Sequence, residues 1–310
     1  MSIFIIAEAG VNHNGCFEEA IKLVEEAKKS GCDAIKFQTF NYERVAGLTA
    51  QLSEYQSKNT SLFNNQRDML KSLQLSKNEF KDLKRFCDEL KIEFMSTPSD
   101  TEDLEFLISL DIKRIKIGSS DIDNKALLFK AAKTGLQIII STGMSTYSEV
   151  ERAVNYLKSF NNIGEIIIMQ CTSQYPCPDE EINLNVLDTY KNNFKNIVGF
   201  SDHSLGNMAA ICSIAKGAKY IEKHFTLSKD LDGPDHKASL DPQELKEFVS
   251  SIRNAEKYLG NNNKLISNCE KENRKKMRKS LIENKDGSFL IQRPPNRGLD
   301  PWMWNPKDYI

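Results

Sequence analysis

The sequence predicts an α/β fold of the (β/α)8 TIM barrel type, and three observations support this prediction. Short β-branched segments alternate eight times with longer segments whose apolar residues recur at helical spacing. No G-x-G-x-x-G segment follows the first predicted strand, which disfavours a dinucleotide-binding open sheet. The 310 residues accommodate one barrel of about 250 residues and a tail. A doubly wound sheet remains the alternative, because alternation alone does not show whether a sheet closes.

The eight predicted strands are short segments rich in residues that favour extended structure. In chain order they span Ile3 to Ala7, Ala34 to Phe37, Glu93 to Ser96, Arg114 to Ile117, Gln137 to Ser141, Ile166 to Gln170, Ile197 to Phe200 and Lys219 to Phe225. The predicted helices each place apolar residues on one face, as Ala20, Leu23, Val24 and Ala27 do in the first. These helices span Glu18 to Ser30, Ser76 to Leu90, Glu102 to Ser109, Lys125 to Lys133, Tyr147 to Ser159, Leu184 to Asn193, Asn207 to Lys216 and Pro242 to Leu259.

Two segments depart from the alternation. Residues 41–75 are polar and rich in Asn, Gln and Ser, and we expect an irregular arm with a short helix that ends before Ser76, where Ser76 and Glu79 match a capping box. The pattern also changes after Gly260. We expect a barrel over 1–260, a linker over 261–284 and a short final segment over 285–310 that is too small to fold without packing on the barrel or on another subunit.

The composition excludes several classes of partner. Lys and Arg total 42 and Asp and Glu total 43, so a net charge of −1 gives no long-range attraction to nucleic acid or to an anionic membrane. No apolar run approaches the roughly 20 residues needed to span a bilayer. The seven cysteines form no C-x-x-C pair, which favours reduced thiols and a cytoplasmic location over a disulfide framework.

Two lysines indicate where the chemistry lies. Active sites of barrel enzymes form at the carboxyl ends of the strands, and every predicted strand here is followed by polar residues. Lys36 and Lys116 lie inside apolar strands at alternating positions, where an unpaired ammonium group is costly to bury. If both face the barrel mouth, they form a cation pair that nearby Ser and Thr hydroxyls complete as a phosphate or carboxylate site. The alternative is that each lysine is a structural ion-pair partner.

The histidines suggest a metal site. Of the four histidines, His203 and His224 follow neighbouring predicted strands, so their side chains are placed to converge. Two imidazoles suit a borderline divalent ion such as Mn²⁺. The alternative is one hydrogen-bonded core histidine and one general base. The turn from Leu231 to His236 carries two carboxylates and is placed to reach over the barrel mouth, unless it is a solvated acidic loop.

At these residues the sequence resembles the sialic acid synthase family. The resemblance rests on an ordered set of short motifs, one at each strand end, and not on any single tetrapeptide. They are Ala7-Glu8-Ala9-Gly10-Val11-Asn12-His13-Asn14-Gly15, Lys36-Phe37-Gln38-Thr39, Ser96-Thr97-Pro98, Lys116-Ile117-Gly118-Ser119, Ser141-Thr142-Gly143-Met144, Ser201-Asp202-His203-Ser204, Glu222-Lys223-His224-Phe225-Thr226 and Gly233-Pro234-Asp235.

The resemblance implies an enzyme that condenses phosphoenolpyruvate with an N-acylated six-carbon sugar, such as N-acetylmannosamine, to form a nine-carbon α-keto acid. It implies that His203 and His224 hold Mn²⁺ or Mg²⁺ and that Glu8 moves or steers a proton. The residues implied to hold phosphoenolpyruvate are Lys36, Thr97, Lys116, Ser119, Ser141, Ser173 and Ser201. Those implied to meet the sugar are Glu8, Gln38, Tyr175 and Asp235, with Asp121 at a position where many members carry Glu.

The tail is expected to depart from the family pattern. Members carry an antifreeze-like domain that is swapped onto the partner's barrel in a homodimer, and Glu272 to Leu281 resembles its start. Arg293 resembles the arginine that this domain delivers to the partner's sugar site, with Arg297 as the alternative. The short stretch between Lys285 and Gln292 indicates a shortened or degenerate domain over 285–310.

Three other functions remain open at this stage. The same chemistry on a different sugar would make legionaminic or pseudaminic acid. A catalytically silent barrel would bind sugar phosphates without turning them over. An aldolase would form a Schiff base on a lysine, which borohydride trapping with pyruvate would reveal.

Overall fold

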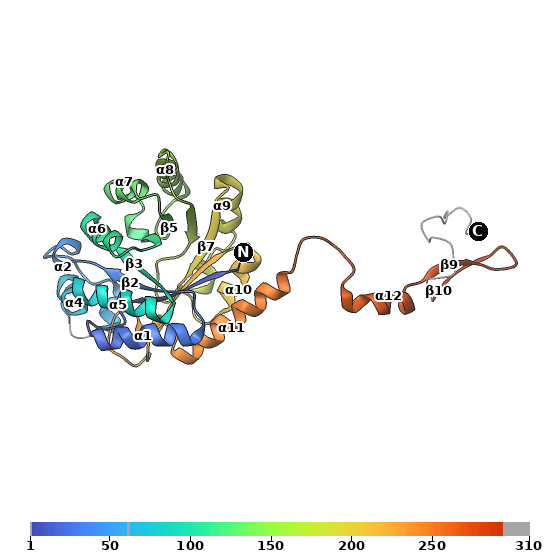
Figure 1. Cartoon of the computed structure of the whole chain (residues 1–310), viewed down its shortest axis with the longest axis horizontal. Coiled ribbons are helices and arrows are strands. Elements are labelled where there is room, and N and C mark those ends of the chain that lie inside the picture. Colours follow the sequence, from blue (N-terminus) through green and yellow to red (C-terminus); the bar gives the residue numbers. More distant parts are fainter. Residues whose placement is uncertain (1, 61–62, 294–310) are drawn as a thin grey trace. The chain divides into compact units, whose positions relative to one another are not determined.

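The structure is a computed structural model that describes residues 2–60 and 63–293 (Figure 1). The chain divides into two compact units, Met1–Leu259 and Gly260–Ile310. Within the described residues, no helix has the length and apolar character needed to cross a membrane.

Eight parallel strands form the wall of the first unit. They are β1 (Phe4–Gly10), β2 (Ala34–Thr39), β3 (Glu93–Pro98), β4 (Arg114–Ile117), β5 (Gln137–Ser141), β6 (Ile166–Gln170), β7 (Ile197–Asp202) and β8 (Tyr220–His224). Their hydrogen-bonded order is β3-β2-β1-β8-β7-β6-β5-β4, and β3 also lies against β4. The first strand pairs with the last, and the contact between β3 and β4, the two ends of this order, closes the sheet. This confirms the barrel and excludes the doubly wound alternative.

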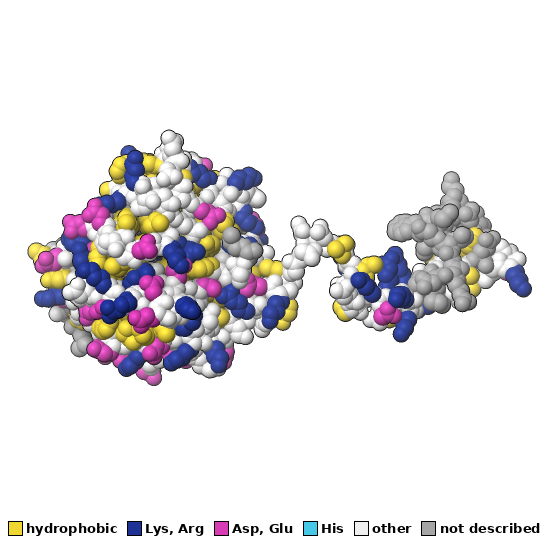
Figure 2. Space-filling view, in the orientation of Figure 1, with side chains coloured by type: hydrophobic (Ala, Val, Ile, Leu, Met, Phe, Trp, Pro, Cys, Tyr) yellow, Lys and Arg dark blue, Asp and Glu magenta, His cyan; other side chains and the backbone are white. Residues whose placement is uncertain are grey.

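Helices cover the outside of this wall (Figure 1). They are α1 (Phe17–Ser30), α5 (Lys77–Leu90), α6 (Thr101–Ser109), α7 (Lys125–Lys133), α8 (Tyr147–Lys158), α9 (Val186–Phe194), α10 (Met208–Ala215) and α11 (Pro242–Leu259). The capping box at Ser76 and Glu79 is present, so the predicted start of α5 is confirmed. Lys and Arg are interspersed with Asp and Glu over the barrel face in Figure 2, as the near-zero net charge predicts.

Strand alternation divides the barrel's side chains into two sets. Outward residues such as Ile5, Ile35 and Ile221 belong to a large apolar cluster shared with the helices. Inward residues such as Ile6 and Ile139 form a smaller cluster that fills the lower barrel. At the carboxyl ends the inward positions become polar, so the barrel floor is apolar and its mouth is built for polar ligands.

Several strands extend further than the sequence pattern predicts. β2 continues to Thr39 and β3 to Pro98, and Gln38 pairs with Thr97 in the ladder between them. The apolar pattern stops earlier because Gln38 and Thr97 are polar, yet both keep strand geometry and line the mouth. These two site residues are therefore on the rigid wall, whereas others, such as Ser119 and His203, lie in the turns that follow the strands.

The arm over 41–75 contains more helix than predicted. It forms α2 (Tyr42–Val45), α3 (Glu54–Asn59) and α4 (Gln66–Leu73). Met69 and Leu73 of α4 pack with Val11 and Phe40 in a separate small core. The single short helix expected here was wrong, because short polar helices held by caps leave little apolar periodicity to detect.

The second unit is described over residues 260–293. It contains α12 (Lys271–Met277) and an antiparallel hairpin of β9 (Ser280–Glu283) and β10 (Phe289–Gln292). Arg293 follows the hairpin and is exposed, whereas Arg297 lies outside the described residues.

Gly199 of β7 leaves no room for a side chain beside Tyr220 of β8, and this gives a stability prediction. A methyl group on residue 199 would lie 2.8 Å from the Tyr220 carbonyl oxygen and 2.9 Å from the Tyr220 Cβ. We expect Gly199→Ala to lower the free energy of unfolding by about 1–3 kcal/mol, because packed strands cannot yield without strain. The control is Gly47→Ala, where the added methyl meets no described atom within 4 Å. Equal urea midpoints for the two variants would contradict this packing.

Candidate functional site

A cavity of about 470 Å³ opens at the carboxyl ends of the barrel strands. It collects side chains from all eight strands or the turns that follow them. The sequence-predicted site residues that line it are Glu8, Lys36, Gln38, Thr97, Lys116, Ser119, Asp121, Ser141, Ser173, Tyr175, Ser201, His203 and His224. The expectation that the two lysines and the two histidines share one basin is therefore met.

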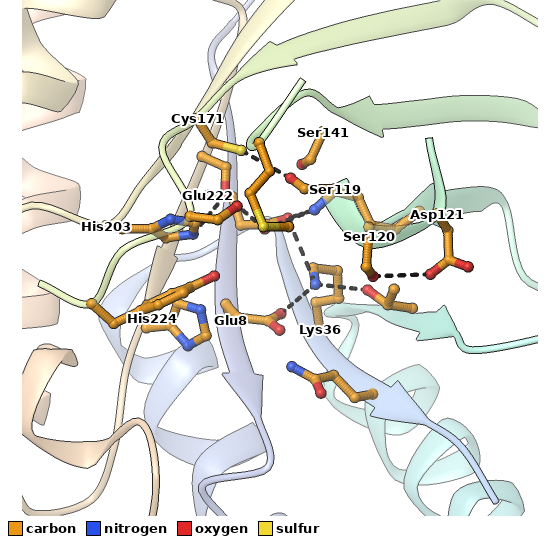
Figure 3. A pocket seen from close by; sticks show the side chains of 18 of the residues that line it. Glu8, Lys36, Ser119, Ser120, Asp121, Ser141, Cys171, His203, Glu222 and His224 are labelled. Atoms are coloured by element: carbon orange, nitrogen blue, oxygen red, sulfur yellow. Dashed lines mark hydrogen bonds and ion pairs between the residues drawn. The ribbon is translucent and has the colours of Figure 1, made fainter. Parts of the chain in front are cut away.

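Four buried charged side chains lie together in the pocket, and Figure 3 labels three of them, Glu8, Lys36 and Glu222. Lys36 Nζ lies 2.7 Å from a Glu8 carboxylate oxygen and 3.8 Å from Glu222. Lys116 Nζ donates hydrogen bonds to both Glu222 oxygens, at 2.8 and 3.0 Å. All four side chains are at most 5% exposed. Two cations and two anions thus neutralise one another, which makes their joint burial tolerable.

The strand register brings these charges together. Glu8 is the ladder partner of Lys36 on one side and of His224 on the other, and Ser201 is the partner of Glu222. Side chains that pair across adjacent strands point to the same face. Their proximity therefore follows from barrel closure and not from any flexible loop.

The lysines are not the free cation pair that the sequence analysis favoured. Each is matched by a carboxylate, so the ion-pair alternative describes the geometry correctly. Glu222 was the missed partner, although the sequence contains a signal for it. It stands two residues before His224 in a strand, and this spacing puts both on the same face.

The two carboxylates differ in proton affinity. Burial, with the Glu222 charge nearby, raises the pKa of Glu8 from 4.5 to about 7 despite the opposing effect of Lys36. Burial also acts to raise the pKa of Glu222, but Lys116 and Lys36 outweigh it and lower that pKa to about 2. Glu222 is therefore a fixed anion, whereas Glu8 exchanges its proton near neutral pH, as a proton-transfer group requires.

His203 and His224 face each other, with ring centroids 5.6 Å apart. His203 Nδ1 lies 2.7 Å from the Thr172 carbonyl oxygen, which can only accept, so Nδ1 carries the proton. Ser201 donates its hydroxyl proton to Glu222, which leaves the His203 Nε2 lone pair unused. Burial lowers the pKa of His203 to about 4 and holds the pKa of His224 well below 6.5, so both rings are neutral at pH 7.

These features suit metal ligands. A neutral imidazole whose other nitrogen donates to a carbonyl is the usual arrangement at metal sites. His224 Nδ1 is buried and has no hydrogen-bond partner among the described residues. No group of three or more His, Cys, Asp or Glu side chains in the described part of the chain is arranged to hold a metal, so any ion needs water or substrate oxygens as further ligands.

Small hydroxyl groups line the side of the pocket near Lys36. Thr97 accepts a hydrogen bond from Lys36 Nζ at 2.9 Å. Ser119 accepts from the Gly143 backbone N–H at 3.0 Å and lies 3.2 Å from the Cys171 sulfur. The Ser141 hydroxyl is buried without a hydrogen-bond partner among the described residues. Unused hydroxyl donors beside ammonium groups are what a phosphate or carboxylate ligand needs.

The arm contributes a wall that the sequence analysis missed. Ser53, Tyr55, Gln56 and Gln66, from α3, α4 and the turn before α3, line the cavity. The Tyr55 ring packs on Tyr175 with a centroid distance of 5.1 Å. These residues had no strand-end motif to identify them, and only the tertiary fold places them over the barrel mouth.

Three predicted residues have different placements. Asp121 lines the pocket on the side away from the histidines (Figure 3). Asp235 is buried near the lining residues Tyr55 and Tyr175, with a pKa that burial raises to about 6, but it lies outside the cavity lining. Arg293 belongs to the second unit and is exposed there.

Comparisons with known proteins agree with this geometry. The NeuB family model matches residues 23–264. The chain is 43% identical to an N,N'-diacetyllegionaminic acid synthase of Legionella pneumophila, over 97% of this chain and 88% of that protein. It is 35% identical to the human N-acetylneuraminate-9-phosphate synthase, over 90% and 77% of the respective lengths. A sialic acid synthetase of Leptospira borgpetersenii, solved with citrate, superposes with a TM-score of 0.79 at 33% identity over 88% of this chain and 90% of that one.

The raised pKa of Glu8 gives a pH prediction. Between pH 4.5 and about 7 the native state keeps a proton that the unfolded chain releases, so rising pH lowers the free energy of unfolding over this interval. Gln at position 8 cannot titrate. We expect the stability of Glu8→Gln relative to the wild type to increase by about 3 kcal/mol between pH 4.5 and pH 8 in urea unfolding.

The matched control is Glu25→Gln, which changes a half-exposed carboxylate of α1. Its unfolding curves should follow the wild type at every pH. If Glu8→Gln also follows the wild type, Glu8 does not hold a proton in the native barrel.

Proposed function

This chain belongs to the NeuB family, and on that premise we propose that it condenses phosphoenolpyruvate with an N-acylated hexose sugar to give a nine-carbon nonulosonic acid and phosphate. The observation that carries the proposal is the cluster of four buried charged residues beside two neutral imidazoles. The four are Lys36, Lys116, Glu8 and Glu222. The two lysines are cations that can bind a small anion with several negative charges. Glu8 can gain or lose a proton near neutral pH, and the two histidines can bind a divalent ion.

We assign phosphoenolpyruvate to the lysine side of the pocket. Its phosphate and carboxylate would engage the ammonium groups together with nearby hydroxyls, which are those of Thr97, Ser119, Ser141, Ser173 and Ser201. Because the lysines are already oriented by the carboxylates, the ligand meets a preformed site. Holding both anionic groups fixes C3 of phosphoenolpyruvate toward the sugar and converts a bimolecular encounter into an intramolecular one.

We assign the sugar to the opposite part of the pocket. Gln38 and Tyr175 would bind its hydroxyls, and the arm residues Tyr55 and Gln56 enclose it from above. Asp121 would meet the sugar on its far side. Asp235 would act through the two tyrosines that it approaches.

The reaction forms one carbon–carbon bond and breaks one carbon–oxygen bond. C3 of phosphoenolpyruvate attacks the aldehyde carbon of the open-chain sugar, and the aldehyde oxygen takes a proton. Water then adds to the cationic C2 and loses a proton. The tetrahedral product expels phosphate by cleavage of the C2–O bond and leaves the keto group. This classifies the enzyme as a transferase of phosphoenolpyruvate.

Glu8 is the residue we assign to proton transfer. It touches Lys36, its pKa of about 7 allows it to give or take a proton at neutral pH, and its strand partner is His224. It can therefore deliver a proton near the aldehyde oxygen while Glu222 remains charged and holds Lys116 in place.

His203 and His224 would hold the divalent ion, Mn²⁺ or Mg²⁺. When bound, such an ion supplies Lewis-acid polarisation of a carbonyl group. The chain's contribution is to present two neutral rings, one of them fixed by the Thr172 carbonyl group.

The relative with the highest identity among those described above suggests a second candidate for the sugar. Its name gives a diacetylated legionaminic acid as product, so a sugar with two N-acetyl groups is our second candidate beside N-acetylmannosamine.

We further propose roles for the remaining parts of the chain. In the proposed organisation 1–260 is the synthase barrel, 261–284 a linker and 285–310 a reduced antifreeze-like segment that supplies Arg293 to the sugar site of a partner in a homodimer. The cytoplasm is the proposed location, because the seven cysteines are all free thiols.

The central experiment supplies phosphoenolpyruvate, Mn²⁺ and a panel of N-acyl hexosamines, including a sugar with two N-acetyl groups. We expect release of phosphate that retains the bridging oxygen of phosphoenolpyruvate, together with a nine-carbon keto acid detected by mass spectrometry. Arg293→Ala should raise the KM for the sugar and leave the KM for phosphoenolpyruvate unchanged. A covalent adduct trapped by borohydride and pyruvate, with no nine-carbon product, would favour the Schiff-base aldolase instead.

The lysine assignment predicts the behaviour of a charge-balanced variant. Lys116→Met combined with Glu222→Gln removes one cation and one anion, so no charge is left unpaired in the buried cluster. We expect phosphoenolpyruvate affinity to fall at least thirtyfold in calorimetry, about 2 kcal/mol or more, because an engaged buried cation is lost. The control is Lys113→Met, which changes the exposed lysine directly before β4. Unchanged affinity in the double variant would place the anion site elsewhere.

The metal assignment predicts the effect of removing either imidazole. His203→Ala and His224→Ala should each abolish Mn²⁺ binding, measured by electron paramagnetic resonance of free Mn²⁺, since two ring ligands are already the minimum. Phosphoenolpyruvate binding without metal should change little. Wild-type rates in chelator-treated protein would exclude a metal role.

A further inference from the structure

A second buried ion pair lies directly behind the two histidines and takes no part in the reaction described above. Lys223 Nζ lies 2.9 Å from Asp202 Oδ2, and both side chains are at most 1% exposed. The two residues are ladder partners at the ends of β7 and β8. Because Ser201, His203, Glu222 and His224 line the pocket, strand alternation puts Asp202 and Lys223 on the opposite, helix-facing side of the wall.

The pair holds the turn that carries His203. Asp202 Oδ1 accepts hydrogen bonds from the Ser204 backbone N–H at 2.9 Å and from the Ser204 hydroxyl at 2.6 Å. Lys223 Nζ donates to the Ser204 carbonyl oxygen. The N–H, the hydroxyl and the carbonyl of Ser204 are thus all bound by the pair, and Ser204 itself is buried.

This arrangement ties together the two strand ends that carry the imidazoles. His203 lies between Asp202 and Ser204, so its backbone is fixed on both sides. Lys223 lies between Glu222 and His224 on β8, so the same ion pair fixes the second strand against the first. Stability alone does not require charges here, because an apolar pair of equal volume is often at least as stable as a buried ion pair.

We propose that Asp202 and Lys223 are positioning residues that set the distance and orientation of His203 relative to His224 and thereby the affinity of the site for a divalent cation. The inference rests on the metal assignment of the proposed function. This positioning role differs from the role of the four buried charges in the pocket, which face the substrate.

The test is Mn²⁺ binding by the full-length protein, followed by electron paramagnetic resonance. Asp202→Asn combined with Lys223→Met removes both charges at once, so no buried charge is left alone, but it also removes the link from β8 to Ser204. We expect the Kd for Mn²⁺ to rise about tenfold or more, as for other groups that orient metal ligands. The Kd for phosphoenolpyruvate without metal should stay within twofold, because Lys36 and Lys116 lie on other strands.

Two further variants separate positioning from general stability. Asp33→Asn with Arg253→Met removes another ion pair, with a 2.7 Å contact, between the start of the barrel and α11. It should lower the thermal midpoint without changing the Kd for Mn²⁺. Ser204→Ala removes only one hydrogen bond to Asp202 and should fold normally, with a Kd for Mn²⁺ raised several-fold, so the test stands even if the double variant does not fold.

The possible outcomes distinguish the positioning role of Asp202 and Lys223 from the metal assignment on which it rests. Mn²⁺ binding by the wild type with an unchanged Kd in Ser204→Ala and in the folded double variant would overturn the positioning role alone. A wild type that binds no Mn²⁺ would overturn both this role and the metal assignment.

Discussion

The structure depends on the mutual neutralisation of four charges buried at the barrel mouth. Lys36 and Lys116 could not remain ionised there alone, and neither could Glu8 and Glu222. Together they form an alternating arrangement in which each lysine has a carboxylate within 2.8 Å. This compensation is unequal, because Glu222 approaches both cations while Glu8 contacts Lys36 alone among them. The four charges can therefore be buried together. The negative charge of Glu8 is less well compensated than that of Glu222, so Glu8 takes up a proton more readily.

The barrel wall explains how such a cluster can be held without loops. The four charges come from β1, β2, β4 and β8, and the closure of β8 on β1 brings the first and last of these strands together. Inside the wall, alternation directs ligand-binding groups into the pocket. Outside it, the same alternation directs Asp202 and Lys223 away from the substrate, where they hold the turn behind His203. Strand alternation thus separates the residues that face the ligand from Asp202 and Lys223, which hold the turn that carries His203.

Much of this organisation could be predicted from the sequence, for identifiable reasons. Strand periodicity and the strand-end rule together place Lys36, Lys116, His203 and His224 in one basin, because a closed parallel barrel leaves a single location for strand-end residues. Glu8 was predicted as a site carboxylate, but its pairing with Lys36 was not, and Glu222 was missed. Strand alternation shows which face a charged residue takes, but not which cation it will meet. Tyr55, Gln56 and Gln66 were missed because the arm that carries them has no regular period. Asp235 is buried outside the cavity lining that it was expected to join, and Arg293 belongs to the second unit, so its role at a sugar site stays a prediction.

The most direct measurement is the number of protons taken up when phosphoenolpyruvate binds at pH 8, obtained by calorimetry in buffers of different ionisation enthalpy. If the anion engages Lys36, it weakens the hold of that lysine on Glu8 and raises the pKa of Glu8 further. The account predicts an uptake approaching one proton in the wild type that is absent in Glu8→Gln. Equal proton uptake in the two proteins would show that the anion and the buried carboxylate do not share a cation, and would contradict the central claim.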